Sequence, residues 1–196
     1  MGKEKYLKDV EKLFKKSPVV SYGSIRKIIR HKKSVKQYTK QLIRNLILKG
    51  KIKKLTKGYY TVYNDSSLSV FCFKPAYLGL QDALSFHNLW EQETIPIVIT
   101  TGKIRPGIRK VLGHNILIRR INKKYFFGFD YYKEHEFYMP YSDIEKTVID
   151  MIYFKEKLSV ESIKEIGKKI NKRRFNSYLS CYPKIFRKRV LNMIRT

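Results

Sequence analysis

The sequence predicts an α+β protein built of two domains. In the first sixty-five residues, three short segments with apolar residues at helical spacing precede two alternating segments, the pattern of three helices and a β-hairpin. A polar stretch, residues 64–67, separates this part from a second region of strand-like and helical segments. We therefore expect one domain at residues 1–65 and another at 66–196, the second a mixed α/β domain with a helical C-terminal tail.

Three short helices are expected in the first domain. In residues 3–16, apolar side chains recur at helical spacing with lysines between them, and Pro18 stops the pattern. Ser21 and Ser34 are suitable N-caps for a second and a third helix, and Gly50 is suited to end the third. The expected buried stripe of the third helix is made of Val35, Tyr38, Leu42, Leu46 and Ile47.

A basic β-hairpin is expected after Gly50. Residues 51–55 and 59–63 alternate between polar and apolar side chains, and Thr56, Lys57 and Gly58 between them are suited to a turn. Three short helices followed by such a hairpin is the order of a winged helix-turn-helix domain, whose third helix enters the major groove of DNA. The sequence therefore predicts a winged helix-turn-helix DNA-binding domain over residues 1–65.

The charge of the chain points to a polyanionic partner. A formal net charge of +27 results from 43 Lys and Arg residues against 16 Asp and Glu residues, far more than solubility requires. A membrane span needs about 18 consecutive apolar residues, and the apolar stretches here are short and interrupted. Because the amino terminus also lacks the apolar centre of a signal peptide, we expect a cytoplasmic protein that binds nucleic acid.

The candidate DNA-binding residues lie on the third helix and on the hairpin. Glutamine is the residue type that pairs with the adenine edge and arginine the type that pairs with guanine, whereas lysines more often hold phosphates. Taken singly, these residues also suit an ordinary solvated helix face. The hairpin lysines beside them favour DNA binding over a winged domain used in protein contacts. The candidates are Lys33, Ser34, Lys36, Gln37, Lys40, Gln41, Arg44, Lys51, Lys53, Lys54 and Lys57.

The second region alternates strand and helix patterns. The expected helices are residues 76–90, 142–154, 159–170, 174–181 and 184–194, and the expected strands are residues 95–100, 111–112, 116–118, 125–129 and 136–138. The aromatic residues of 125–138 suit either base stacking or a half-buried strand, and their alternation with polar residues favours the strand. Basic clusters in the tail are candidates for contacts with a partner or nucleic acid, or for solvated helix faces: Lys168, Lys169, Lys172, Arg173, Arg174, Arg187, Lys188 and Arg189.

Acidic residues crowd beside a lysine at Asp143, Glu145, Lys146 and Asp150. The grouping is superficially similar to a metal-dependent nuclease site, but it lacks the Glu-x-Lys spacing of such sites. Acidic residues are also favoured in the first turn of a helix, which explains them without catalysis. Because the cysteines and histidines show no metal-ligand spacing either, we expect a non-enzymatic protein without a metal or cofactor.

Three short motifs, taken together, resemble a known family. They are Lys57-Gly58-Tyr59-Tyr60, the segment of residues 83–89 that reads ALSFHNL, and the Glu145-Lys146-Thr147 run followed by Asp150. The chain resembles the AbiEi-type antitoxins, winged-helix transcriptional regulators of type IV toxin-antitoxin systems, over most of residues 3–154. The resemblance implies a first domain that represses its own operon and a second that opposes a nucleotidyltransferase-like toxin. It also implies a structural motif in which Glu145 caps a helix and Asp150 bonds a neighbouring element.

Two other functions remain open at this point. One is a stand-alone winged-helix transcription factor without a toxin partner. The other is a metal-dependent nuclease that uses Asp143 and Glu145. The candidate partners are therefore operator DNA, a nucleotidyltransferase-like toxin and a second copy of the chain in a homodimer, which would match symmetric half-sites.

Overall fold

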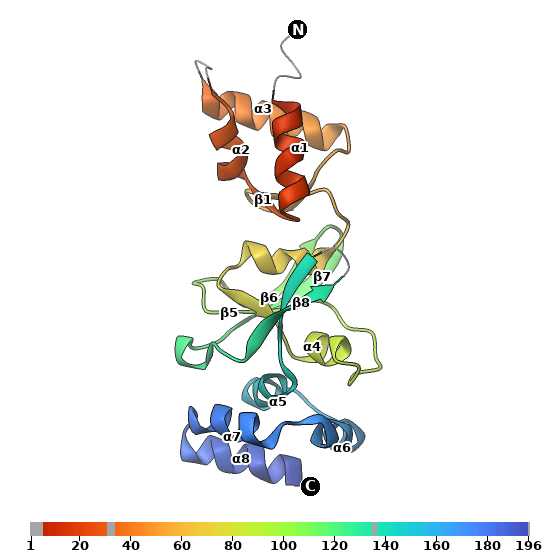
Figure 1. Ribbon diagram of the computed structural model, residues 1–196, viewed down its shortest axis with the longest axis vertical. Helices are drawn as coiled ribbons and strands as arrows, with labels where there is room; N and C mark the ends of the chain where they lie inside the picture. Colours follow the sequence, from red (N-terminus) through yellow and green to blue (C-terminus); the bar gives the residue numbers. More distant parts are fainter. Residues whose placement is uncertain (1–5, 31–33, 135–136, 196) are drawn as a thin grey trace. The chain divides into compact units, whose positions relative to one another are not determined.

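The computed structural model describes residues 6–30, 34–134 and 137–195. It confirms a mixed α+β fold that contains a six-stranded mixed sheet. The chain divides into two compact units: unit 1 extends to Cys72 and includes Lys110–His114, and unit 2 comprises the other described residues from Phe73 onwards. Figure 1 shows the elements of both units, and each unit is described by itself below.

Unit 1 contains the three expected helices, which are α1 (Leu7–Lys16), α2 (Tyr22–Ile28) and α3 (Val35–Leu48). Ser21 caps α2 as predicted, because its hydroxyl accepts a hydrogen bond from the Ser24 amide at 3.0 Å. Ser34 stands at the N-cap position of α3, but its side chain makes no capping bond.

Gly50 ends α3 as expected, since its φ of +66° lies in the left-handed region. The Gly50 amide donates to the carbonyl of Ile47 and the Lys51 amide to that of Leu46, both at 2.9 Å. These two bonds reverse the chain directly into the hairpin.

The buried face of α3 differs from the expected stripe by a small rotation. Thr39, Leu42, Ile43 and Leu46 are buried, whereas Ile47, which we expected in the core, is 37% exposed. Both patterns satisfy helical spacing, so periodicity alone did not separate them. Because of this rotation, Ile47 lies at the surface next to Lys40 and Arg44 and not in the core.

The small sheet of unit 1 consists of β1 (Val20–Ser21), β2 (Lys53–Thr56) and β3 (Tyr59–Thr61) in the order β1-β3-β2. Both pairings are antiparallel, and the register shifts between Lys54 and Thr56. Gly58 makes the turn with a φ of +83°. The expected hairpin is thus confirmed, and β1 adds a third strand to it.

The polar stretch expected to be a linker leads instead into a packed segment. Residues Ser66–Cys72 form a 3₁₀ helix in which Leu68 and Val70 are buried. The two serines therefore begin an ordered element, because the apolar residues that follow them find a core to enter. The division between the units falls after this element, at Cys72.

The six-stranded sheet belongs to unit 2, apart from Lys110–His114, where its third strand along the chain ends and its fourth begins. Its strands are β4 (Ala76–Leu78), β5 (Ile97–Thr100), β6 (Gly107–Val111), β7 (His114–Arg120), β8 (Phe129–Glu134) and β9 (Phe137–Ser142). Their order is β6-β7-β5-β4-β9-β8. Strand β4 pairs antiparallel with β5 and parallel with β9, while β5 pairs parallel with β7 and β8 antiparallel with β9. Strands β4 and β5 thus hold the centre of the sheet.

Among the described residues, unit 2 has five α-helices: α4 (Gln81–Phe86), α5 (Ile144–Tyr153), α6 (Val160–Lys169), α7 (Lys172–Ser180) and α8 (Lys184–Arg195). The three expected tail helices are confirmed by α6, α7 and α8. Figure 1 shows α5 to α8 lying together, and one apolar cluster includes Tyr77 of β4, Ile149 of α5, Leu179 of α7 and Val190 of α8. The sheet and these helices therefore share one core.

Two expected elements of unit 2 were wrong. Residues 76–78 form a strand rather than the start of a helix, and all three are buried; a short apolar run that is covered on both faces cannot be told from a helix by periodicity. In residues 125–129, a 3₁₀ helix (Lys123–Tyr125) occupies the start, and β8 begins only at Phe129.

We predict that Gly79→Ala destabilises unit 2, because an added Cβ would lie 2.5 Å from Cδ1 of the fully buried Ile99. Overpacking of this kind costs about 1–3 kcal/mol. Thermal denaturation should show a lower midpoint for the variant. Ile99→Val removes Cδ1, so adding it should recover part of the loss; a double variant no better than the sum of the single effects would contradict this explanation.

Candidate nucleic-acid interface

A groove of about 530 Å³ lies in unit 1 between α3 and the β2–β3 hairpin. Its lining combines apolar and basic side chains: Tyr22, Lys40, Ile43, Arg44, Ile47, Leu48, Lys54, Lys57, Gly58 and Tyr60. Lys40 and Arg44 come from the helix, whereas Lys54 and Lys57 come from the hairpin. Cations therefore stand on both walls of a groove that is otherwise largely apolar.

Helical geometry brings the α3 side of this groove together. Lys40, Arg44 and Ile47 are spaced by four and three residues, so they share one face of the helix. On the hairpin, Lys54 lies opposite Tyr60 in the register, and Lys57 stands in the turn. The groove is thus built on regular secondary structure rather than on a long loop.

Tyr22 joins the three elements that surround the groove. Its backbone amide donates to the carbonyl of Gly58 at 2.7 Å, and its hydroxyl donates to the carbonyl of Lys36 at 3.3 Å. The first bond ties the start of α2 to the hairpin turn, and the second ties it to α3. These contacts fix the distance between the two walls.

The structure separates the predicted DNA-binding residues into two groups. Lys40, Arg44, Lys54 and Lys57 converge on the groove. Others lie elsewhere on the surface: Ser34, Lys36, Gln37 and Gln41 are exposed on or beside α3, and Lys53 donates to the Asn64 side chain at 3.1 Å. Lys33 lies outside the described residues.

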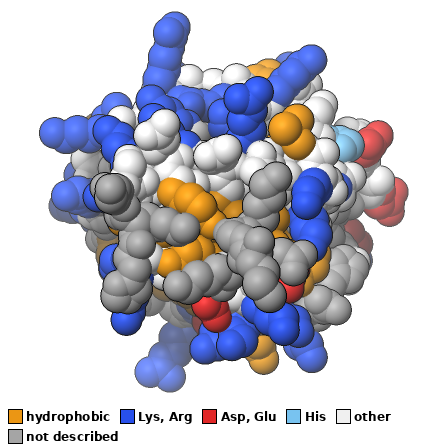
Figure 2. Space-filling view, turned by 90° about the horizontal axis from the view of Figure 1, so that it is seen from above, with side chains coloured by type: hydrophobic (Ala, Val, Ile, Leu, Met, Phe, Trp, Pro, Cys, Tyr) orange, Lys and Arg blue, Asp and Glu red, His pale blue; other side chains and the backbone are white. Residues whose placement is uncertain are grey.

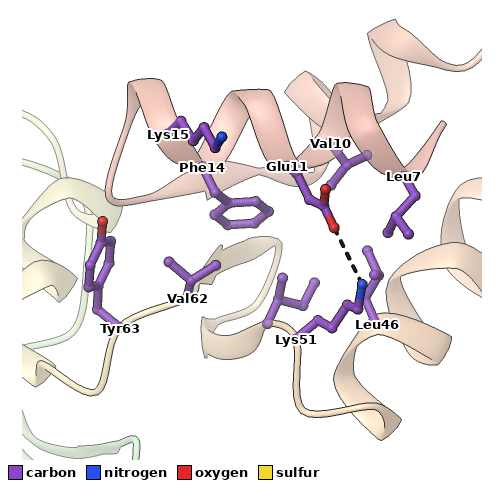
Figure 3. A pocket seen from close by; sticks show the side chains of 10 residues that line it. Leu7, Val10, Glu11, Phe14, Lys15, Leu46, Lys51, Val62 and Tyr63 are labelled. Carbon is purple, nitrogen blue, oxygen red and sulfur yellow. Dashed lines mark hydrogen bonds and ion pairs between the residues drawn. The ribbon is translucent and has the colours of Figure 1, made fainter.

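Lys51 belongs to a different pocket of unit 1, which Figure 3 shows. This pocket, of about 380 Å³, lies between α1 and the residues that follow β3. Val10, Phe14 and Val62 contribute to its apolar lining. At its rim Lys51 donates to Glu11 at 3.3 Å. The ion pair offsets the charge of Lys51, so this lysine does not extend the basic groove.

Figure 2 shows one face of the molecule. Lys and Arg side chains stand around much of its edge, with Asp and Glu side chains at the right and below, and hydrophobic side chains are exposed near the centre. Four of the groove residues were not among the DNA-binding candidates predicted from the sequence: Ile47, Leu48, Tyr22 and Tyr60. The signal for the first two was present, since they follow Arg44 by three and four residues on the helix.

Two of the basic tail residues are engaged within unit 2. Arg174 lies 3.8 Å from Asp143 and 3.6 Å from Glu145, and Lys168 lies 2.5 Å from Glu165. The remaining candidates, Lys169, Lys172, Arg173, Lys188 and Arg189, are exposed, and Arg187 is half-buried. Arg174 is thus better explained by helix packing than by a partner contact.

Asp143, two residues before the Glu145-Lys146-Thr147 motif, caps α5. Asp143 accepts hydrogen bonds from the Lys146 amide and from the Tyr178 hydroxyl, both at 2.7 Å. Burial raises the pKa of this carboxyl, and the two bonds oppose that shift. The expectation that Glu145 caps this helix was wrong. Glu145 instead accepts from the Asn171 amide at 2.6 Å and joins α5 to the start of α7.

Lys146 and Asp150 form a fully buried ion pair within α5. The Tyr77 hydroxyl donates to the other oxygen of Asp150 at 2.6 Å, and the Tyr182 hydroxyl lies 3.4 Å from Nζ of Lys146. Burial raises the pKa of Asp150 and lowers that of Lys146, while their mutual attraction opposes both shifts. Asp150 thus bonds a neighbouring strand, β4, as the sequence motif implied.

These contacts bear on the nuclease alternative. The oxygens of Asp143 and Glu145 face Tyr178, Arg174 and the Asn171 amide, which use them to hold α7 against α5. Within residues 6–30, 34–134 and 137–195, no group of three or more His, Cys, Asp and Glu side chains is placed to hold a metal ion. Of the two cysteines, Cys181 is exposed and Cys72 is partly buried.

Two further observations concern the whole described chain. Among its helices, none is both long and apolar enough to cross a membrane. No family model and no curated protein matches the sequence.

We predict that Lys146→Met destabilises unit 2 by about 3–5 kcal/mol, because it leaves Asp150 buried without its cation. Adding Asp150→Leu should recover much of this loss, since no buried charge then remains. Chemical denaturation compares both single variants with the double variant. If the loss in the double variant equals the sum of the two single losses, the two residues are not coupled.

The loss in Lys146→Met should also depend on pH. Without the lysine, the folded-state pKa of Asp150 rises further above its value in the unfolded chain, so the protonated carboxyl favours the fold. The destabilisation is therefore expected to be smallest below about pH 4, the ordinary carboxyl pKa, and to grow as the pH rises. A pH-independent loss would contradict this assignment.

Proposed function

We propose that unit 1 is a winged helix-turn-helix module that binds double-stranded DNA, with α3 as recognition helix and the β2–β3 hairpin as wing. The observation that carries the proposal is the groove in which Lys40 and Arg44 face Lys54 and Lys57 across an apolar floor. Each wall supplies two cations to the same narrow space. Such an arrangement suits a ligand with charged edges and an apolar middle.

A sugar-phosphate strand has this chemistry. Where a helix enters the major groove and a hairpin lies beside it, one backbone strand runs between the two elements. Its phosphates would meet lysine and arginine, and its deoxyribose carbons would lie against the partly exposed Ile47. The groove therefore supplies the positioning contacts, which carry most of the affinity for DNA.

The absence of opposing charge strengthens this assignment. Between Glu11 and Asp65 the sequence contains no Asp or Glu, so α2, α3 and the hairpin carry only basic charges. No side chain of these elements would repel a phosphate. The net charge of +27 adds a long-range attraction that raises the rate of encounter with DNA.

The resemblance to AbiEi-type antitoxins extends the proposal to the whole chain. On this basis the protein is a cytoplasmic, non-catalytic repressor that binds its own operator through unit 1 and opposes a nucleotidyltransferase-like toxin through unit 2. The structural use of Glu145 and Asp150 in the helix packing of unit 2 supports a motif without catalysis. A stand-alone transcription factor would share unit 1 but would have no toxin partner.

We predict that Lys40→Ala combined with Arg44→Ala weakens binding to a short duplex and flattens its salt dependence. The slope of log K against log salt should become shallower by about 0.9 for each phosphate contact that is lost. Fluorescence anisotropy at several salt concentrations measures both effects. Lys54→Ala with Lys57→Ala, on the other wall, should act in the same way.

The matched control is Lys51→Ala combined with Lys53→Ala, which removes the same charge from outside the groove. It should leave the slope close to that of the unaltered protein. If the control weakens binding as much as the groove variants do, the charge acts non-specifically and the groove is not the interface.

Coexpression tests the antitoxin part separately. We expect the chain to restore growth to cells that express a nucleotidyltransferase-like protein encoded beside it. The Lys40→Ala, Arg44→Ala variant should still protect these cells while losing repression of a reporter placed behind the operon promoter, because the two roles belong to different units. Failure of the unaltered chain to protect would favour the stand-alone transcription factor.

A further inference from the structure

One exposed stripe of α3 lies directly opposite its buried face. Gln37, Gln41, Arg44 and Leu48 are spaced by four, three and four residues, so they follow one line along the helix. All four side chains are exposed, and Leu48 is 74% exposed. A large apolar side chain thus continues a row of polar and basic ones on the exposed face of α3, the helix that we propose for recognition.

The apolar character continues towards the groove. Ile47, 37% exposed, lies next to Leu48, and both line the groove together with Lys40 and Arg44. A single exposed leucine is common on protein surfaces. Here two adjacent aliphatic side chains, Ile47 and Leu48, are exposed among the four cations of the groove, in a segment with no acidic residue. A DNA duplex bound at the groove would cover both of them.

The chemistry of the stripe matches one kind of base pair. A glutamine amide offers a donor and an acceptor, which fit N7 and the N6 amino group of adenine, and the thymine methyl is the apolar group that the major groove presents. An isobutyl side chain has no polar atom and gains only from such a methyl. Arg44 lines the groove together with Lys40, Lys54 and Lys57, where the proposed function places the phosphates, so we assign it no guanine.

We propose that α3 reads A·T base pairs in the major groove, with Leu48 against thymine methyl groups and Gln37 and Gln41 facing adenines. The inference rests on the proposed DNA binding and adds the class of sequence that is bound. From Gln37 to Leu48 the helix rises about 16 Å, the length of about five base-pair steps. The row is therefore long enough to contact several successive pairs.

Four synthetic duplexes with alternating sequence separate the possible modes of reading. They contain A·T, A·U, inosine·C or G·C pairs. Uracil is thymine without the methyl group, and inosine lacks the guanine amino group, so an inosine·C duplex presents the minor groove of A·T and the major groove of G·C. Binding of the full chain to each duplex is measured by fluorescence anisotropy at one salt concentration.

We expect the unaltered protein to bind A·T most tightly, with A·U about three- to five-fold weaker, as for the loss of one buried methyl contact. Inosine·C and G·C should be weaker still and similar to each other. Leu48→Ala should bind the A·T and A·U duplexes equally. Ile185→Ala, which truncates an aliphatic side chain that is 80% exposed on α8, should keep the preference for thymine.

Several results would overturn the inference. Equal binding of A·T and A·U by the unaltered protein would remove the methyl contact, as would a thymine preference that persists in Leu48→Ala. Inosine·C bound as tightly as A·T would indicate reading of the minor groove. If all four duplexes bind equally and with strong salt dependence, DNA binding stands while A·T reading fails; no binding to any of them would overturn the proposed function itself.

Discussion

The buried ion pair of Lys146 and Asp150 is the interaction on which unit 2 depends. It lies within α5, but its two members reach out of that helix, because Asp150 accepts from Tyr77 of β4 and Lys146 approaches Tyr182 after α7. A charge taken out of water is costly unless it is paired and hydrogen-bonded. The pair therefore holds only when strand, helix and tail are in place together, which makes the packing of unit 2 specific.

The same helix organises its surroundings through its N-terminus. Asp143 caps α5 and binds Tyr178 of α7, while Glu145 accepts from the backbone at the start of α7. Arg174 lies close to both carboxylates and offsets their charge. Asp143 and Glu145, whose grouping suggested a catalytic site, thus connect α5 to α7. This structural role explains why the two acidic residues lie so close together in the sequence.

Unit 1 uses charge in the opposite way. Its core is apolar and includes Val10, Phe14, Ile25 and Leu46, while its lysines and arginines stay at the surface. Exposed charges cost little in stability and act at a distance, so they suit the capture of a polyanion. The groove between α3 and the hairpin concentrates four of them around an apolar floor. That combination favours DNA over a simple acidic surface, because a sugar-phosphate strand carries both charge and apolar carbon.

The sequence by itself determined the local elements of unit 1 and the strong positive charge on which the proposed DNA binding rests. Neighbouring residues alone set the helical spacing, the Ser21 cap, the turn at Gly58 and the end of α3 at Gly50. The net charge can be counted from the sequence without a structure. The α5 and tail helices were equally readable, because their apolar residues recur with a single period.

Only the tertiary structure decided which of these features meet. It turned Ile47 out of the core, made a central strand of residues 76–78, and separated Lys51 and Lys53 from the lysines that share the groove. It also assigned the cap of α5 to Asp143 rather than Glu145. The cap is a local bond between residues three apart, whereas the first three cases share one physical reason. Spacing along the chain determines which residues share a face of a helix or strand. Whether those residues are buried, and which side chains they contact, depends on the segment that packs against that face.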